Sequence, residues 1–378
     1  MHRNAIYILV LITAGLTALG LVMLSSTGAF AHKSPGDYFF LKRQCAWLGV
    51  ALVAATVGAC VNYNFWRRIW PYVFGLAFVL LILCFVPHVG MKINGSYRWI
   101  NLGFSNFQPS ELAKLAAIFF VAWWFSKYEK DSGTLLKGFV YPMAIVGLLL
   151  IPIAREQDLG YTALIGAVSI SMMYLAGMRL LWAAPLAIIG VIGIVFAATC
   201  IPERMARLLA FLDPEGNADK FYQQLQGLIA FGSGGVDGLG LGNSRQKMDY
   251  LPFAHTDFIF PMIGEELGLI FTLLVVFSYL VICFCGCLVA MNARDRFGML
   301  LGFGLTMMVT LQAVVNIGVT TALLPNKGMP LPFISFGGSN LMICYFMIGI
   351  LINVHCHGHP LVETVSPALK RVRNFCRL

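Results

Sequence analysis

Apolar runs of about twenty residues, separated by polar stretches, recur along the whole chain. A helix needs roughly 20 apolar residues to cross a hydrocarbon core of about 30 Å, and the backbone polar groups must be satisfied within the spanning structure. The pattern therefore predicts an all-α polytopic membrane protein with about ten transmembrane helices. We expect them near residues 5–25, 43–62, 69–88, 110–126, 138–154, 162–178, 180–201, 266–291, 298–323 and 333–354.

One long hydrophilic loop, residues 202–257, interrupts this pattern, and no other connection approaches its length. Connections longer than about 15 residues in a compact domain are usually functional. Apolar residues at 221, 225, 228 and 229 recur at helical spacing against glutamines, which predicts a short amphipathic helix, either lying at the membrane interface or packed as a loop helix. The Gly-rich run GSGGVDGLGLGNS offers backbone amides that would suit a phosphate. It has neither the G-x-G-x-x-G spacing nor the P-loop spacing, so nucleotide binding is not expected.

Composition supports one membrane domain. Hydrophobic residues make up 59% of the chain and charged residues 11%, and there is no internal repeat of the kind common in secondary transporters. We assign residues 1–354 to the transmembrane domain and 355–378 to a basic cytoplasmic tail. The first span precedes Ala29-Phe30-Ala31, a signal-peptidase-like pattern, but its length favours a retained helix over a cleaved one.

Basic residues in the loops predict the orientation, because cytoplasmic loops carry the excess of Lys and Arg. Placing both termini in the cytoplasm puts four basic clusters on that side and the 202–257 loop outside. The clusters are Arg67/Arg68, Lys127/Lys130/Lys137, Arg294/Arg296 and Lys370/Arg371/Arg373. The net charge of +9 then lies mainly on the cytoplasmic face, where anionic lipid headgroups attract it. The basic residues therefore do not predict a nucleic-acid partner.

The sequence has no metal-binding signature. Its ten cysteines form no C-x-x-C pair, and Cys283, Cys285 and Cys287 point in alternating directions on a helix. There is also no D-x-D pair. We therefore assign no metal site and no cofactor, although a divalent cation such as Mg²⁺ or Mn²⁺ stays compatible with the sequence.

Ionisable residues beside the spans are candidates for function, because charge at membrane depth is costly. Arg98 lies in a Gly- and Trp-containing stretch that we interpret as re-entrant. Glu111 and Lys114 share one helix face, as a structural ion pair or as functional groups. The other candidates are Arg155, Glu156 and Asp158 in a short turn, Glu265 and Glu266 at a helix start, and Asp257 at the end of the long loop.

Several long motifs in order resemble the SEDS family (shape, elongation, division and sporulation), which includes FtsW, RodA and SpoVE. They are GSYRWINLG with QPSELAKL, EQDLGYTAL, FLDP with FYQQLQGLIAFGSGGVDGLGLGNSRQK, YLPFAHTDFIFPMIGEELG, and LPNKGMPLPFISFGGSN. The stretches GLGNSRQK and PNKGMPLPFISFGGS are more similar to the FtsW branch than to RodA. The resemblance covers nearly the whole chain.

This resemblance implies an inverting peptidoglycan glycosyltransferase that polymerises lipid II at the outer face of the bacterial cytoplasmic membrane, at the division septum. It also implies a class B penicillin-binding protein and other divisome membrane proteins as partners, and it assigns Asp257 as the catalytic general base. We assign substrate binding to Arg98, Glu111, Lys114, Asp158, Arg245, Lys247, His255 and Lys327. A lipid II flippase is the alternative of another class, and a scaffold that only recruits the partner is a third.

The sequence departs from the family pattern at four positions. Phe253 stands where a glutamate is common, which argues against a catalytic role for that position here. Gln157 stands for a proline, Tyr161 follows the glycine of that turn, and Phe336 stands for a tyrosine.

Overall fold

A computed structural model describes residues 2–28, 38–93, 96–101, 106–182, 202–247, 250–252 and 254–357. Helices dominate these residues, as expected. They are α1 (His2–Gly28), α2 (Phe39–Cys60), α3 (Tyr63–Leu83), α4 (Pro109–Lys127), α5 (Tyr141–Arg155), α6 (Leu159–Leu175), α8 (Pro202–Leu212), α9 (Ala218–Gly234), α10 (Ile259–Met291), α11 (Arg296–Thr320) and α12 (Gly338–His357). There are also two short 3₁₀ helices, η1 (Glu129–Asp131) and η3 (Leu180–Trp182), and a π-helix, η2 (Leu136–Val140), that leads directly into α5.

Nine of the ten predicted segments fall within the described residues, and each is a helix at about the expected position. Within the described part of the chain, seven helices are long and apolar enough to cross a membrane, and Leu159–Leu175 is a shorter apolar one. The described α4 covers the span expected at 110–126, although it carries Glu111 and Lys114. The span expected at 180–201 and most of the 355–378 tail lie outside the described residues, so the count of ten stays a prediction.

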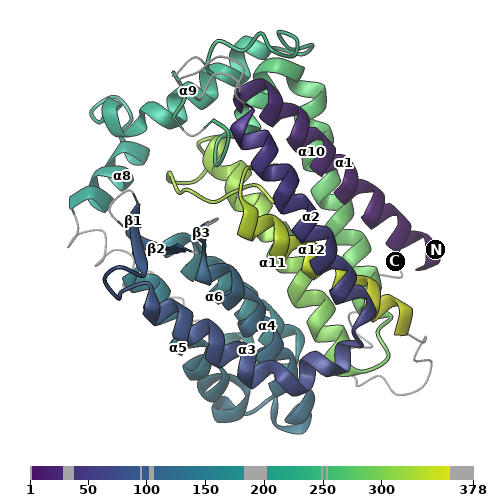
Figure 1. The fold of residues 1–378 in the computed structure, drawn as a ribbon. Coiled ribbons are helices and arrows are strands. Elements are labelled where there is room, and N and C mark those ends of the chain that lie inside the picture. Colours follow the sequence, from purple (N-terminus) through teal and green to yellow (C-terminus); the bar gives the residue numbers. More distant parts are fainter. Residues whose placement is uncertain are drawn as a thin grey trace.

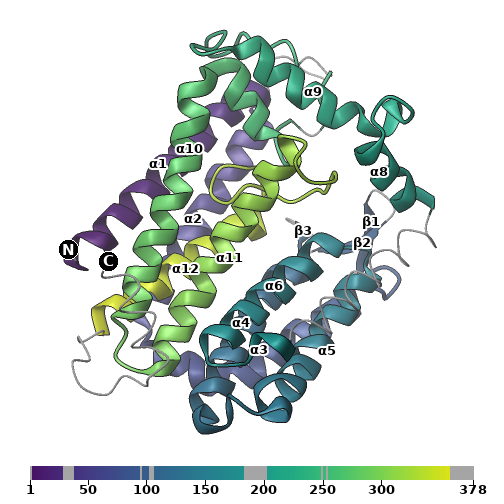
Figure 2. The ribbon, with the colours of Figure 1, turned by 180° about the vertical axis from the view of Figure 1, so that it is seen from behind.

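The helices form two groups that pack side by side (Figures 1 and 2). One contains α3, α4, α5 and α6. The other contains α1, α2, α10, α11 and α12, and within it α2 packs closely on α12 because Gly58 and Gly349 let the two backbones meet. Helix α11 joins the groups through α4 and α6, and its side chains are largely buried.

A small antiparallel sheet replaces the re-entrant segment that we expected around Arg98. Its strands are β1 (Gly90–Ile93), β2 (Ser96–Asn101) and β3 (Asn106–Phe107), in the order β1-β2-β3. The pairs Gly90 with Ile100 and Ile100 with Phe107 set the register. Ile100 is therefore paired on both sides, whereas Arg98 lies at the register shift opposite Met91 and Lys92, where β2 has an extra, unpaired residue.

Helix α9 confirms the amphipathic helix predicted in the long loop, and it lies across the end of the bundle away from the N label (Figure 1). Its glutamines face the protein: Gln224 Nε2 donates to the carbonyls of Val319 at 2.8 Å and Leu324 at 2.9 Å. Its apolar residues face outward, with Leu225, Leu228 and Ile229 about 40% exposed. This outward apolar face favours the prediction of a helix at the membrane interface.

The Gly-rich run packs against a break in α10 at Gly268, whose φ of 78° is in the left-handed region. Leu239 N donates to Glu265 O and Gly240 N to Glu266 O, both at 2.9 Å. These amides therefore bind carbonyls of α10 and not a phosphate. A Cβ on Gly268 would overlap the backbone of Val236, so glycine is required by contact as well as by φ.

We expect Gly268→Ala to destabilise the protein by about 1–3 kcal/mol, because alanine is strained at this φ and would push the Gly-rich run away. Thermal unfolding of the purified protein in detergent measures the loss. The matched control is Gly232→Ala in α9, where a Cβ meets open space and the helix would keep or gain stability. Equal melting temperatures for the two variants would contradict the prediction.

Candidate active site

Asp257 lies directly before α10, at the end of the long loop. Asn316 of α11 holds its backbone, since Nδ2 donates to Asp257 O at 2.8 Å and to Met329 O at 2.6 Å. A Cβ on Gly328 would lie 2.6 Å from Asp257 Oδ2, so only glycine lets the carboxylate approach this segment. The end of the long loop and the loop between α11 and α12 thus meet at Asp257.

Asp158 faces this point from the other helix group. It is the N-cap of α6, where its Oδ1 accepts from Tyr161 N at 3.3 Å. Arg98 Nη1 lies 3.5 Å from Asp158 Oδ2, and the same guanidinium donates to the carbonyls of Glu156 at 3.4 Å and Gln157 at 2.9 Å. The strand β2 and the turn before α6 are therefore tied together through Arg98.

Four charged groups gather here, because electrostatic effects link Asp257, Asp158, Arg98 and Lys327. Burial raises the pKa of Asp257 to about 7; the negative charge of Asp158 adds to the rise, and Arg98 opposes it. Burial also raises the pKa of Asp158, against the effects of Arg98 and Lys327. Asp257 keeps some exposed surface, so the carboxyl is accessible although neighbouring atoms displace much of its hydration.

Two neighbours complete the surroundings. Glu156 is buried beside Asp158, and burial followed by the Asp158 charge raises its pKa to about 8. His255 packs on Phe40, with ring centroids 4.2 Å apart, and its carbonyl accepts from Phe336 N at 3.1 Å. Burial lowers the pKa of His255 to about 4, so the ring is neutral at neutral pH.

Glu111 and Lys114 form the ion pair that their spacing predicts, at 2.7 Å and with both side chains fully buried. Tyr161 Oη donates to Glu111 Oε1 at 2.5 Å, and Lys114 Nζ donates to Gln312 Oε1 at 2.8 Å. Gln312 Nε2 in turn donates to Pro330 O at 2.8 Å. The pair therefore holds α6 through Tyr161, and the loop that carries Lys327 through Gln312 and Pro330.

Lys247 and Arg245 belong to a different cluster. Lys247 Nζ lies 3.3 Å from Glu266 Oε1, both side chains being fully buried, and Ser26 of α1 bonds the same carboxylate at 2.6 Å. Arg245 N donates to Glu265 Oε1 at 3.0 Å, while the Arg245 residue is exposed. Glu265 and Glu266 thus bind the long loop and α1 to α10, a role that their spacing from Asp257 alone did not predict.

Sequence reasoning missed Tyr161 and Gln312 as parts of the site. Tyr161 was visible only as a departure from a motif, and Gln312 only as an amide inside an apolar span. Phe253 lies outside the described residues. Within the described ranges, no group of three His, Cys, Asp or Glu side chains is placed to hold a metal ion.

Fold and site together define a polytopic helical membrane protein with an acid–base cluster between two helix groups at one end of the bundle. The family model described as "Cell cycle protein", which covers FtsW, RodA and SpoVE, matches residues 7–359. The chain therefore belongs to the FtsW/RodA/SpoVE family, as its motifs predict.

Similar proteins and solved structures agree with this family membership. The chain is 38% identical over 350 residues to a probable peptidoglycan glycosyltransferase FtsW of Geobacter metallireducens, covering 92% of this chain and 93% of the relative. It is 37% identical to the stage V sporulation protein E of Bacillus subtilis, covering 92% and 96%. A chain from a solved peptidoglycan synthase complex that coordinates polymerization and crosslinking matches with a TM-score of 0.74 and 26% identity, covering 92% and 96%. Thermus thermophilus RodA shares the fold, with a TM-score of 0.68, 24% identity and coverage of 93% and 96%.

Proposed function

We propose that this chain is a peptidoglycan glycosyltransferase that polymerises lipid II at the outer face of the cytoplasmic membrane, with Asp257 as general base. The observation that carries the proposal is the position of Asp257, where two loops and two helix groups meet beside Arg98, Asp158 and Lys327. The names of the relatives support the reaction class. The 202–257 loop is then extracytoplasmic and both termini are cytoplasmic.

The reaction joins two lipid II molecules. The 4-hydroxyl of one sugar attacks the anomeric carbon of another, a C–O bond forms there with inversion, and the bond to undecaprenyl pyrophosphate breaks with its electron pair. Asp257 accepts the hydroxyl proton as the bond forms. A carboxyl whose pKa is about 7 suits this role, because it is substantially ionised at neutral pH and is more basic than an ordinary aspartate.

The leaving pyrophosphate develops negative charge, and Arg98 and Lys327 supply positive charge at the cluster. Arg98 is held by the carbonyls of Glu156 and Gln157, so its charge is positioned before substrate arrives. Glu111 and Lys114 act through Tyr161 and Gln312 as positioning residues. Lys247, neutralised by Glu266, shapes the loop; Arg245 and His255 remain candidates for contact with the substrate.

The polymerisation rate is expected to fall as the pH is lowered through about 7, because protonated Asp257 cannot accept the hydroxyl proton. Well below this pKa the loss approaches about tenfold per pH unit. Initial rates of the purified enzyme between about pH 5.5 and 8.5 test this. Glu156→Gln is the control: Glu156, with a pKa of about 8, is mostly neutral at pH 7, so the midpoint should stay near 7. If the pH midpoint of the rate shifted in Glu156→Gln, the assignment of Asp257 as the titrating base would be contradicted.

The function itself is tested with purified protein and lipid II, with and without a class B penicillin-binding protein, the partner class suggested by the synthase complex. Glycan strands, resolved by gel electrophoresis, would support the polymerase. We expect the partner to raise the rate, and we place the complex at the division septum with other divisome proteins. Failure to form any polymer in either condition would contradict the proposal.

A lipid II flippase would need titratable groups along a path through the bilayer. Among the described residues, the buried charges of α4 are already paired with each other, and the other clusters lie near the ends of α6 and α10. In reconstituted vesicles, relocation of labelled lipid II without polymer would favour the flippase.

A further inference from the structure

Two adjoining hollows open at the end of the bundle opposite Asp257. Helix α10 starts just after Asp257 and ends at Met291, and the part that follows its break at Gly268, residues 269–291, spans about 35 Å, enough to cross a hydrocarbon core of about 30 Å. Arg294 and Asp295 follow that far end. The hollows therefore lie at the opposite membrane boundary from the proposed active site.

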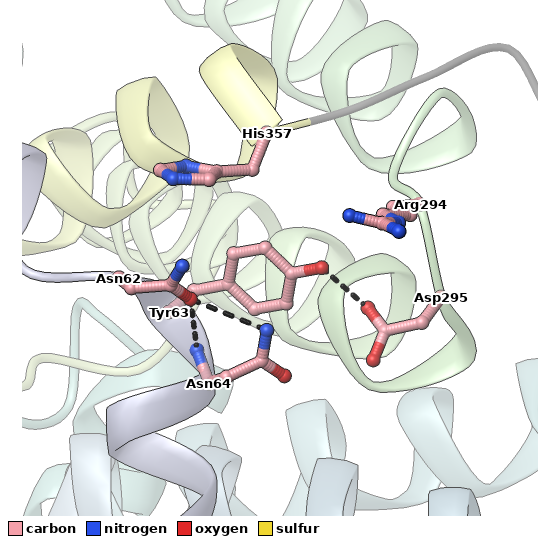
Figure 3. A pocket seen from close by; sticks show the side chains of 6 residues that line it. All are labelled: Asn62, Tyr63, Asn64, Arg294, Asp295 and His357. Atoms are coloured by element: carbon pink, nitrogen blue, oxygen red, sulfur yellow. Dashed lines mark hydrogen bonds between the residues drawn. The ribbon is translucent and has the colours of Figure 1, made fainter.

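The larger hollow, about 530 Å³, is lined by Asn64, Arg67, Arg68 and Trp123. The smaller one, about 240 Å³, shares Asn64 and adds Asn62, Tyr63, Arg294, Asp295 and His357 (Figure 3). Both flank the start of α3. Their charged lining is three arginines against one aspartate, which favours an anionic ligand.

The single acid is already engaged. Asp295 Oδ1 accepts from Tyr63 Oη at 2.8 Å (Figure 3). As the N-cap of α11, it also accepts from Gly298 N at 3.1 Å. Its contact with Arg67 is long, 4.0 Å, between side chains that are 42% and 34% exposed, so the pair is weak. Arg68 is exposed and forms no ion pair with any residue in the described ranges. Positive charge in the larger hollow is therefore not compensated.

Aromatic residues place the larger hollow at the depth of lipid headgroups. Trp123 packs on Trp70 with ring centroids 4.6 Å apart, and Lys127 Nζ lies 5.0 Å from the Trp123 ring centroid. Tryptophan beside lysine and arginine at a helix end is typical of the membrane–water boundary. A ligand here would meet cations on the aqueous side and an indole ring on the lipid side.

We propose that these hollows bind the phosphodiester headgroup of an anionic phospholipid. The phosphate lies between Arg67 and Arg68, whose planar guanidinium groups match phosphate oxygens in pairs. The Asn64 amide donates to the same headgroup, and Trp123 packs against the glycerol and the first methylenes. Basic pockets between membrane helices are suited to such headgroups.

The test uses the full-length protein in detergent and native mass spectrometry with added phosphatidylglycerol or phosphatidylcholine. We expect phosphatidylglycerol to be retained in preference to phosphatidylcholine. Arg68→Gln should weaken its retention about fivefold, the effect of removing roughly one basic contact with an anionic surface, and R67Q/R68Q by more. Arg68→Lys, which keeps the charge but loses the paired geometry, should fall between wild type and R68Q.

The matched control is Lys130→Gln, which removes one exposed positive charge from the η1 turn outside both hollows. It should leave retention unchanged. Three results would overturn the proposal. An equal loss in K130Q would indicate diffuse charge attraction, and equal retention of the two lipids would indicate binding through apolar contacts alone. Displacement of phosphatidylglycerol by inorganic phosphate would indicate a site for free phosphate. Elution as a single peak in gel filtration shows that R68Q is folded, so a loss of binding is read as a loss of the site.

Discussion

Asp257→Asn is expected to lower lipid II polymerisation by about 10²–10⁴-fold, the usual contribution of a general base. The asparagine keeps the size of the side chain but cannot accept the hydroxyl proton. The fold should survive, because Asn316 holds residue 257 through its backbone carbonyl and not through its side chain. The effect is measured as the polymerisation rate of the purified variant relative to wild type at equal protein concentration. The amount of each protein in the membrane before purification shows whether the variant folds.

The matched control is Asp237→Asn, which removes an exposed carboxylate from the Gly-rich run of the same loop. It should polymerise lipid II at the wild-type rate. Wild-type activity in D257N would exclude Asp257 as the base, and an equal loss in D237N would show that the loop, and not this carboxylate, limits the rate.

Lys114→Met is expected to destabilise the protein by about 3–5 kcal/mol, because it leaves Glu111 as an uncompensated charge among buried groups. The double variant Glu111→Gln/Lys114→Met removes both charges and should recover most of this loss. Thermal unfolding in detergent compares the three proteins. If the double variant were as unstable as K114M, the loss would come from packing and not from the unpaired charge.

Lys137→Met provides the comparison at an exposed pair of similar geometry, since Lys137 Nζ lies 2.8 Å from Asp131 Oδ2 with both side chains more than a third exposed. Water already solvates both charges there, so we expect little change in the melting temperature. A large loss in K137M would indicate that burial does not explain the effect at Lys114.

The membrane helices were predictable because lipid leaves the backbone few choices, and a span of apolar residues is long enough to be seen without knowing its partners. The Glu111–Lys114 pair was predictable for a related reason: residues three apart on one helix must be neighbours. The amphipathic α9 followed from its own periodicity. Each of these features depends on residues that are close in the sequence.

The features that escaped prediction depend on distant residues. The spacing of Asp158 and Asp257 along the chain carries no information that these two carboxyls lie close enough to affect each other's charge. The predicted topology groups Lys247 with Asp257 because both fall on the same side of the membrane, but Lys247 pairs with Glu266 of α10. Strands of four, six and two residues are too short to show an alternating pattern, so the sequence around Arg98 predicts a re-entrant segment and not a sheet.

The position of Arg98 on that sheet determines how much the surroundings must rearrange during the proposed reaction. Its guanidinium is held by two neutral carbonyls and by Asp158. Hydrogen bonds to carbonyls orient a cation without cancelling its charge. In water, solvent dipoles would have to reorient around a forming pyrophosphate, whereas in the proposed reaction the guanidinium of Arg98 is already aligned before the substrate binds. The reorganisation free energy of the charge-separating step should therefore be smaller with arginine at this position than with a lysine on a freely rotating side chain.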